Sequence, residues 1–306
     1  MITAINSYNP WTAFALLCIR DSLTLVSRLG ERGAQVVSSS RDAGYRFWDP
    51  ETLRVDQAVE ELFIARLREQ GIAAIVLSEE AQRVEVTAEQ QAPGLDEPVY
   101  FVSDPFDGSL LYKRRIPAFW FTSLAIYGMD GQPKCAAVGD CIEGTVDFAD
   151  SEGAYTGRFV GDDAVDVETI RPATTRELGQ AFLETYLMKP HYMYPAAHTY
   201  EPLLRRVKFI LPNGGPAAFA DVAKGRVDVY LALQQPFVDV FPGLFIAQQA
   251  GAVVSTFQGE EVTFSPDLDR RYDIVCSATT ELHQQVLAQL AEIAAPFDRA
   301  HDKQEA

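Results

Sequence analysis

The sequence predicts a mixed α/β (α+β) protein in which helices cover β-sheets. In both halves of the chain, apolar runs of strand length alternate with segments whose apolar residues recur at helical spacing, which is typical of layered architecture. The 306 residues, 47% of them hydrophobic, suffice for one large domain or two moderate ones. A composition shift at 160–175 indicates a boundary. We therefore expect an N-terminal half over 1–165 and a C-terminal half over 166–306.

The N-terminal half is predicted to begin with two helices and to continue as an antiparallel or mixed sheet. Val55, Val59 and Phe63 lie on one stripe of the second helix, which Gly71 ends. Gly and Asp turns separate the later apolar runs, as they do between successive strands. In order, we expect helices at 10–38 and about 50–70, a strand at 72–78, a polar surface loop over 81–98, and strands at 99–102, 118–128 and within 133–155.

The C-terminal half alternates strands and helices again. Its last helix precedes a polar tail, 298–306, that we expect to be frayed. In order, we expect a strand at 181–187, a helix near 200–206, a strand at 208–211, a helix at 215–225, a strand at 227–233, a helix at 241–251, strands at 252–256 and 273–278, and a helix at 280–294.

Composition excludes several classes of function. The net charge of −17 argues against nonspecific binding to a nucleic-acid polymer, which requires basic surface. It leaves room for a small phosphorylated substrate, because a bound metal can invert the local field. The apolar run at 11–19 is shorter than the roughly 20 residues of a membrane span, and residues 1–11 lack the basic region of a secretion signal.

Cysteine and histidine give no sign of a metal cluster. The four cysteines form no C-x-x-C pair, so we expect reduced, mostly buried thiols in a cytoplasmic protein. The four histidines have no cluster spacing, and we expect them on the surface or in loops. The cysteines are Cys18, Cys135, Cys141 and Cys276, and the histidines are His191, His198, His283 and His301.

Acidic residues carry the strongest functional signal. In "VYFVSDPFDGSLLYKRRIP", Asp104 and Asp107 follow the apolar run 99–102 directly. Two carboxylates fixed side by side repel each other, and a divalent cation would offset the repulsion. Glu79 similarly follows an apolar strand, and Asp239 lies near the start of a helix.

Other patterns of acidic residues fit this segment less well. The segment "FDGSLL" resembles the haloacid dehalogenase signature, but Pro105 occupies the position of the nucleophile, and the same spacing does not fit an EF-hand loop. Asp104 and Asp107 could form an ordinary turn, Glu79 and Glu80 a solvated pair, and Asp239 a helix cap. One shared site is the more economical explanation for three such acidic clusters.

Taken together, these blocks resemble the inositol monophosphatase and fructose-1,6-bisphosphatase superfamily. The matching segments are "LRVDQAVEELFIARL", "SEE", "DPFDGS" and the span "NGGPAAFADVAKGRVDVYLALQQPFVDVFPGLFIAQQAGAVV". The resemblance covers the chain from about residue 45 to the last helix. It implies a five-layered α-β-α-β-α sandwich, a homodimer, and Mg²⁺-dependent hydrolysis of the phosphate ester of a small metabolite such as an inositol, sugar or nucleotide phosphate.

The resemblance also implies roles for individual residues. It assigns Ser109 to activation of the attacking water, Asp56 to orientation of that hydroxyl, and Glu79 to catalysis as well as metal binding. Two or three Mg²⁺ ions would be held by Glu79, Asp104, Asp107, Asp239 and the backbone carbonyl of Phe106. Phosphate would be bound by Asp107, Gly108, Ser109, Arg114 and Arg115.

The sequence departs from the family pattern at several positions. Ser78 replaces the Gly of G-E-E, Val238 replaces the Trp before Asp239, and Ala232 replaces a Glu that binds a ring hydroxyl in inositol monophosphatases. Inositol 1-phosphate is therefore in doubt as the substrate. The cations at 113–115 are either solvated or meet a second phosphate. A family member without turnover, acting as a binding or regulatory protein, is the alternative function.

Overall fold

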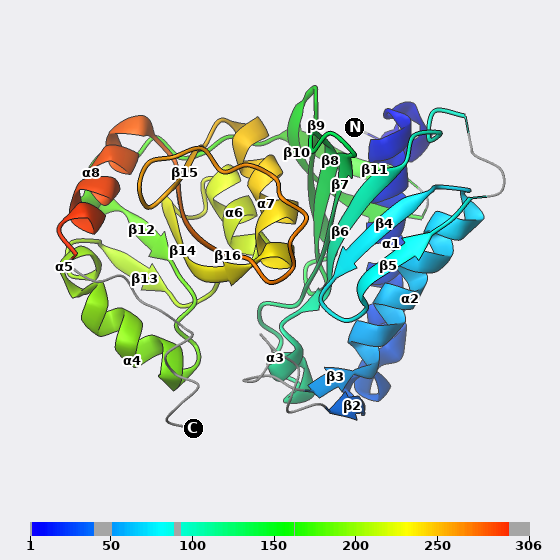
Figure 1. Ribbon diagram of the computed structural model, residues 1–306, viewed down its shortest axis with the longest axis horizontal. Coiled ribbons are helices and arrows are strands. Elements are labelled where there is room, and N and C mark those ends of the chain that lie inside the picture. Colours follow the sequence, from blue (N-terminus) through cyan, green and yellow to red (C-terminus); the bar gives the residue numbers. More distant parts are fainter. Residues whose placement is uncertain (1, 40–50, 89–92, 162, 294–306) are drawn as a thin grey trace. The chain divides into compact units, whose positions relative to one another are not determined.

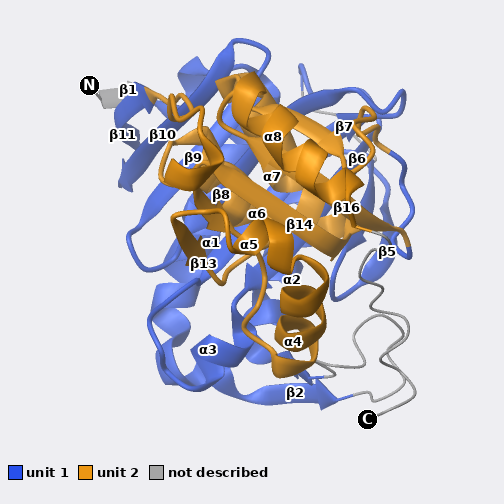
Figure 2. Ribbon diagram, turned by 90° about the vertical axis from the view of Figure 1, so that its left-hand side faces the viewer, with its two compact units in different colours: residues 1–168, 265–269 blue, residues 169–264, 270–306 orange. Residues whose placement is uncertain are grey.

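The computed structural model describes residues 2–39, 51–88, 93–161 and 163–293 (Figure 1). Two compact units are present (Figure 2): unit 1 comprises Met1–Glu168 and Ser265–Asp269, and unit 2 comprises Thr169–Phe264 and Arg270–Ala306. The sequence placed a boundary between residues 165 and 166, which stays a prediction. It did not anticipate that Ser265–Asp269 groups with unit 1.

Unit 1 is built on a nine-stranded sheet in the order β1-β11-β10-β9-β8-β7-β6-β4-β5. Its strands are β1 (Ile2–Ala4), β4 (Ala74–Ser78), β5 (Gln82–Val86), β6 (Val99–Asp107), β7 (Phe121–Gly128), β8 (Pro133–Asp140), β9 (Thr145–Asp150), β10 (Gly153–Val160) and β11 (Asp163–Thr169). Within this sheet β6 is an interior strand, which runs parallel to β4 and antiparallel to β7. Short apolar strands of this kind are buried by helices on the sheet face.

Two long helices cover one face of this sheet (Figure 1). The helical segments of unit 1 are η1 (Ile5–Ser7), α1 (Pro10–Leu29), η2 (Gly30–Ala34), α2 (Arg54–Glu69) and α3 (Ser109–Lys113), and β2 (Val36–Ser39) pairs antiparallel with β3 (Glu51–Leu53). Asn9 caps α1, because its side-chain oxygen accepts from the Thr12 amide at 3.0 Å. The Asn9 amide and the Thr12 hydroxyl both donate to Asp150 at 2.9 Å, which ties the helix start to β9.

Two expectations for unit 1 were wrong. The first helix ends at Leu29 rather than near 38, since Gly30 has a positive φ of 50° and the chain then turns into η2 and β2. The segment expected to be a surface loop over 81–98 contains β5, which pairs antiparallel with β4. This strand lies at the sheet edge and is largely exposed, so its polar composition is compatible with a strand.

Unit 2 contains a five-stranded sheet in the order β13-β12-β14-β16-β15. Helices α6 and α7 pack on one face and α8 on the other (Figure 1). Its elements are η4 (Leu178–Gln180), β12 (Phe182–Glu184), α4 (Pro190–Thr199), α5 (Glu201–Leu204), β13 (Phe209–Leu211), α6 (Pro216–Ala223), β14 (Val229–Pro236), α7 (Phe237–Ala250), β15 (Val253–Thr256), β16 (Arg271–Ser277) and α8 (Thr280–Ala291). Unit 1 thus supplies one helix layer and one sheet, and unit 2 a sheet with helices on both faces, which confirms the mixed α/β class.

The sequence did not predict α4, and it placed the start of α7 too late. Pro195 lies inside α4, and an internal proline normally argues against a helix. The expected helix near 200–206 corresponds to the short α5 alone. Because α7 begins at Phe237 rather than at 241, Asp239 lies within its first turn.

The buried thiols agree with expectation, whereas one histidine does not. All four cysteines are free, and three are fully buried. His283 is buried within α8 rather than exposed. Its Nε2 lies 2.8 Å from the Ser255 hydroxyl and its Nδ1 lies 3.1 Å from the Ser277 hydroxyl. Among the described residues, no helix is long and apolar enough to cross a membrane.

Acid should destabilise the fold through His283. Burial lowers the pKa of His283 below its ordinary value, so the unfolded chain takes up a proton that the folded chain does not. The stability contribution is complete above about pH 6.5, the pKa of an unperturbed histidine, and is lost as the pH falls below it. We expect the melting temperature to fall between pH 7.5 and 5.5, and His283→Gln to remove part of that fall. The exposed His198→Gln should retain it, and an equal fall in all three proteins would contradict the assignment.

Candidate functional site

A β-bulge places Asp104 and Asp107 on the same face of β6. Asp104 pairs with Ser123 of β7, and Asp107 pairs with Phe121. The two pairs are therefore three residues apart on β6 but only two residues apart on β7, so β6 contains one additional residue. Side chains three apart in a regular strand point to opposite faces, and the additional residue restores the same face. Phe106 packs in the core beneath the helices, and Asp104 is 3% exposed. The proline and the extra residue therefore convert a D-x-x-D spacing into two neighbouring carboxylates.

Glu79 lies beside this bulge through strand register. Ser78 ends β4 and pairs with Ser103 in the parallel strand β6. The residues that follow these partners are Glu79 and Asp104. The carboxyl ends of two adjacent parallel strands thus deliver both acids to one edge of the sheet.

Glu60 of α2 holds the turn that carries Glu79. The Ala81 amide donates to Oε1 of Glu60 at 2.9 Å, and the Ser78 hydroxyl donates to the same oxygen. The Glu80 amide donates in turn to the Ser78 hydroxyl at 3.2 Å. These contacts, which we call the Glu60 clamp, bind the end of β4 to helix α2. The only sign of these contacts in the sequence is Ser78, which stands where the family has a glycine that could not form them.

Ser109 and Asp56 are in direct contact. The Ser109 hydroxyl donates to Oδ1 of Asp56 at 2.6 Å and lies 3.2 Å from the carbonyl oxygen of Phe106. The second oxygen of Asp56 accepts from the Leu53 amide at 2.5 Å. Asp56 is 2% exposed and is the third residue of α2. One buried carboxylate therefore caps a helix and orients a hydroxyl beside the acidic bulge.

Position 108 requires a glycine for two reasons: its backbone conformation, and the lack of room for a side chain. Its φ is +101°, and a Cβ there would lie 2.0 Å from the carbonyl oxygen of Phe119. It precedes α3, a single turn anchored by Tyr112, whose hydroxyl donates to the Gly30 carbonyl at 2.6 Å. Burial raises the pKa of Tyr112, so this hydroxyl stays protonated. The α3 turn is too short to provide a helix macrodipole of any size.

The three cations after α3 have different environments. Lys113 forms an ion pair with Glu51 of β3. The guanidinium of Arg115 lies 5.5 Å from the centroid of the Tyr112 ring, in a cation–π contact. Arg114 is exposed and has no carboxylate partner within 4.0 Å among the described residues. Arg114 is thus the cation with the fewest competing contacts.

The remaining predicted site residues belong to unit 2. Asp239 is partly exposed in the first turn of α7, where a carboxylate interacts favourably with the helix N-terminus. Val238 before it is buried. Ala232 is fully buried in β14 and pairs with Ile274 of β16. The structure therefore brings the Ser109 hydroxyl into contact with Asp56 and places Glu79 next to Asp104 at the ends of adjacent strands. Asp239 lies on helix α7 of unit 2.

The donors of unit 1 fit a hard cation that retains its waters. Among the described residues, no three His, Cys, Asp or Glu side chains converge as a metal cluster. Mg²⁺ is commonly bound by one or two carboxylates together with waters and substrate phosphate, rather than by an all-protein cage. The adjacent carboxylates of Asp104 and Asp107 match that description. The backbone carbonyl of Phe106 offers a further oxygen, the type of ligand atom that Mg²⁺ prefers.

The Glu60 clamp makes a prediction for stability. Ser78→Ala removes a hydroxyl bonded to a buried carboxylate, so we expect a loss of about 1.5–3 kcal/mol in the free energy of unfolding. Ser103→Ala is the matched control, because Ser103 is the register partner of Ser78 and its buried hydroxyl has no hydrogen-bond partner among the described residues. Urea denaturation of both variants measures the difference. Equal stabilities would show that the hydrogen bonds of the Ser78 hydroxyl contribute nothing.

Comparison with known proteins relates this arrangement to one family. The model of the inositol monophosphatase family matches residues 22–295. A fructose-1,6-bisphosphatase/inositol-1-monophosphatase of Methanothermobacter thermautotrophicus is 24% identical over 249 residues, which cover 79% of this chain and 84% of that protein. Nus factor SuhB of Escherichia coli is 26% identical over 211 residues, covering 67% and 71%.

The fold has similar solved structures. An IMPase of Thermotoga maritima superposes with a TM-score of 0.69 at 19% identity, covering 92% of this chain and 96% of that one. At this identity the likeness concerns the fold alone, and it confirms the fold class expected from the sequence.

Proposed function

The chain belongs to the inositol monophosphatase family, and we propose that it is a Mg²⁺-dependent phosphomonoesterase that hydrolyses an inositol, sugar or nucleotide phosphate. One observation carries the proposal: the Ser109 hydroxyl is bonded to the buried Asp56 at 2.6 Å beside a bulge that presents two carboxylates on one face. An ordinary turn requires neither the buried acid nor the shared face.

We assign Mg²⁺ binding to the acids and to one carbonyl. The proposed ligands are Glu79, Asp104, Asp107, Asp239 and the backbone carbonyl of Phe106. When bound, the cation supplies positive charge that stabilises phosphoryl oxygens and makes a water molecule a better nucleophile. The bulge supports this assignment because it fixes the spacing of two ligands before any cation arrives, and the Glu60 clamp does the same for Glu79.

Ser109 and Asp56 then position the attacking water. Because the Ser109 hydroxyl donates a hydrogen bond to Asp56, its oxygen lone pairs are directed away from that carboxylate and can accept a hydrogen bond from water. If the serine oxygen takes a proton from this water, its own proton passes to Asp56. Asp56 is held in place by its second bond to the Leu53 amide. The serine acts here as a proton acceptor and forms no bond to phosphorus.

Phosphate binding is assigned to the loop that follows the bulge. The proposed contacts are the backbone amides of Gly108 and Ser109, with Asp107 at the edge of the site. Glycine allows the close approach of the backbone that an anion needs. Arg114 is the candidate for a second phosphate, whereas Lys113 and Arg115 already contact Glu51 and Tyr112.

A substrate with two phosphates should therefore be preferred. Ala232 lacks the carboxylate that the family uses for an inositol hydroxyl, and a site without that partner discriminates poorly for it. We expect a higher kcat/KM for fructose 1,6-bisphosphate or a 3'-phosphorylated nucleotide than for inositol 1-phosphate. Arg114→Ala and added salt should both reduce the preference while activity on a simple monophosphate is largely kept. A clear preference for inositol 1-phosphate would contradict the argument from Ala232.

Phosphate release by the purified full-length chain tests the proposed activity. The substrates are these three esters, each assayed with Mg²⁺ and with an excess of EDTA. We expect release that requires Mg²⁺ for at least one ester. No release across the panel, although Mg²⁺ binding is detected by calorimetry, would contradict the proposal.

A second candidate function is that of a binding or regulatory protein without turnover. A relative of comparable identity is named as a Nus factor, which supports keeping this alternative. The bonded Ser109 and Asp56 favour the enzyme, because a binding protein has no need of an oriented hydroxyl beside paired acids. The release assay separates the two functions.

A further inference from the structure

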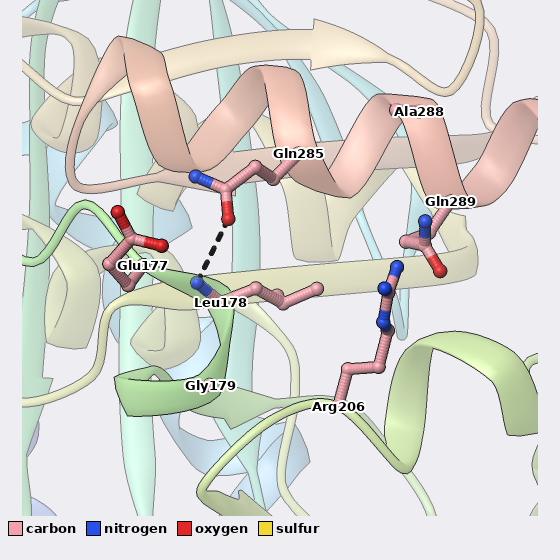
Figure 3. A pocket seen from close by; sticks show the side chains of 7 residues that line it. All are labelled: Glu177, Leu178, Gly179, Arg206, Gln285, Ala288 and Gln289. Carbon is pink, nitrogen blue, oxygen red and sulfur yellow. Dashed lines mark hydrogen bonds between the residues drawn. The ribbon is translucent and has the colours of Figure 1, made fainter.

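Unit 2 contains a cavity of about 430 Å³ that uses none of the phosphatase residues (Figure 3). Its walls are the segment around Leu178, the residue Arg206 that follows α5, and one face of α8. A volume of this size lies within the range of small-molecule sites. The cavity is therefore large enough for a small metabolite.

Two glutamines one helical turn apart line the cavity from α8, and their amides differ in hydrogen bonding. Gln285 accepts from the Leu178 amide at 3.1 Å and donates to the Arg176 carbonyl at 2.6 Å, so its amide is engaged in structure. Gln289 is only 8% exposed, and no hydrogen bond joins its side chain to any described residue. Its amide therefore keeps its hydrogen-bonding capacity for a molecule in the cavity. A ligand oxygen in the cavity can accept a hydrogen bond from this amide.

Arg206 faces the same end of the cavity. Figure 3 shows its guanidinium beside the amide of Gln289. Among the described residues, Arg206 has no carboxylate within 4.0 Å, whereas the adjacent Arg205 pairs with Glu201 at 2.6 Å. Its guanidinium is therefore not engaged by an acid of the described chain. Its planar donors match the geometry of a carboxylate or a phosphate.

The other end of the cavity has the opposite character. Glu177 lies there, and the apolar side chain of Leu178 lies between it and Arg206 (Figure 3). A carboxylate at that end repels a second anionic group. The lining thus favours a ligand with an oxyanion at one end only and an apolar body that can contact Leu178 and Ala288.

We propose that this cavity is a second ligand site, which binds a small metabolite through one terminal oxyanion. The oxyanion accepts hydrogen bonds from Arg206 and Gln289, and the remainder of the ligand packs on Leu178. The oxyanion chemistry is shared by carboxylates and phosphates. The site is independent of the proposed phosphatase function, because it contains none of the residues assigned to that function.

Titration of the ¹⁵N-labelled, full-length chain with butyrate and with inorganic phosphate tests the proposal. Both are added at constant ionic strength while the Gln289 amide and Arg206 Nε signals are followed by NMR. We expect saturable shifts of both signals with at least one probe. Saturation with butyrate alone identifies a carboxylate ligand, and saturation with phosphate alone identifies a phosphate ligand.

Three variants make the test specific. Arg206→Gln should weaken binding at least tenfold, and Arg205→Gln should bind as the wild type does. Gln289→Leu should also weaken binding, because it removes one of the two proposed hydrogen-bond donors. Shifts that grow linearly without saturation, or that persist unchanged at Gln289 in Arg206→Gln, would overturn the proposal. Phosphatase activity does not enter the measurement, so its presence or absence has no bearing on the outcome.

Discussion

Asp104→Asn is expected to lower Mg²⁺-dependent phosphate release by roughly 10³-fold or more, because a metal contributes several kcal/mol of transition-state stabilisation. Asp104 is buried at the bulge and shares a face with Asp107. Replacing one of two neighbouring carboxylates relieves repulsion in the absence of metal. The melting temperature without Mg²⁺ should therefore hold or rise, while the stabilisation on adding Mg²⁺ shrinks.

The control for this variant is Asp130→Asn. Asp130 lies in an exposed turn of the same unit and accepts from the Gln132 amide at 3.0 Å, a bond that asparagine can keep. We expect wild-type turnover and an unchanged response to Mg²⁺ in this control. Activity of Asp104→Asn close to that of the wild type would exclude Asp104 as a ligand.

Ser109→Ala should slow turnover by about 10²–10⁴-fold, the usual contribution of a positioned proton-transfer group. The hydroxyl bonded to Asp56 is lost, whereas the acids of the bulge are untouched. Mg²⁺ binding measured by calorimetry should therefore be close to that of the wild type. Ser109→Thr keeps the hydroxyl that the family has at this position and should retain much of the activity.

The water mechanism has a further consequence at Ser109. Since the hydroxyl positions water and forms no bond to phosphorus, mass spectrometry of the protein quenched during turnover should find no phosphoserine at 109. A phosphorylated Ser109, or an unchanged rate in Ser109→Ala, would contradict the mechanism. Asp56→Asn should resemble Ser109→Ala in rate, because the two residues act through one hydrogen bond.

The sequence predicted most strands of both sheets, because apolar runs of strand length and Gly or Asp turns are local signals. The prediction failed for segments whose local residue preferences differ from the structure they adopt in the folded chain. The polar segment around β5 forms a strand because β4 offers an edge to pair with. The proline-containing α4 was missed because Pro195 is locally unfavourable to a helix.

Some residues of the candidate site could be predicted from the sequence, and others could not. The acids at 104–107 can be recognised from their spacing and from the order of the blocks along the chain. The predicted partners Ser109 and Asp56 are in contact, with 2.6 Å between the serine hydroxyl oxygen and a carboxylate oxygen of the aspartate. Glu60 gave no sequence signal, since a single Glu on an amphipathic helix is usually solvated. Only packing of α2 against the end of β4 reveals that it holds the turn of Glu79.

By itself the sequence determined the α/β class, the acidic clusters and the family to which they point, since each rests on residue type and short-range spacing. Tertiary structure alone decided that Asp104 and Asp107 share a face, because that depends on a bulge defined by the register of β7. It also decided that His283 is buried and that Gln289 and Arg206 meet at one cavity. Burial and contact across elements depend on how distant segments pack, and spacing along the chain carries no information about that.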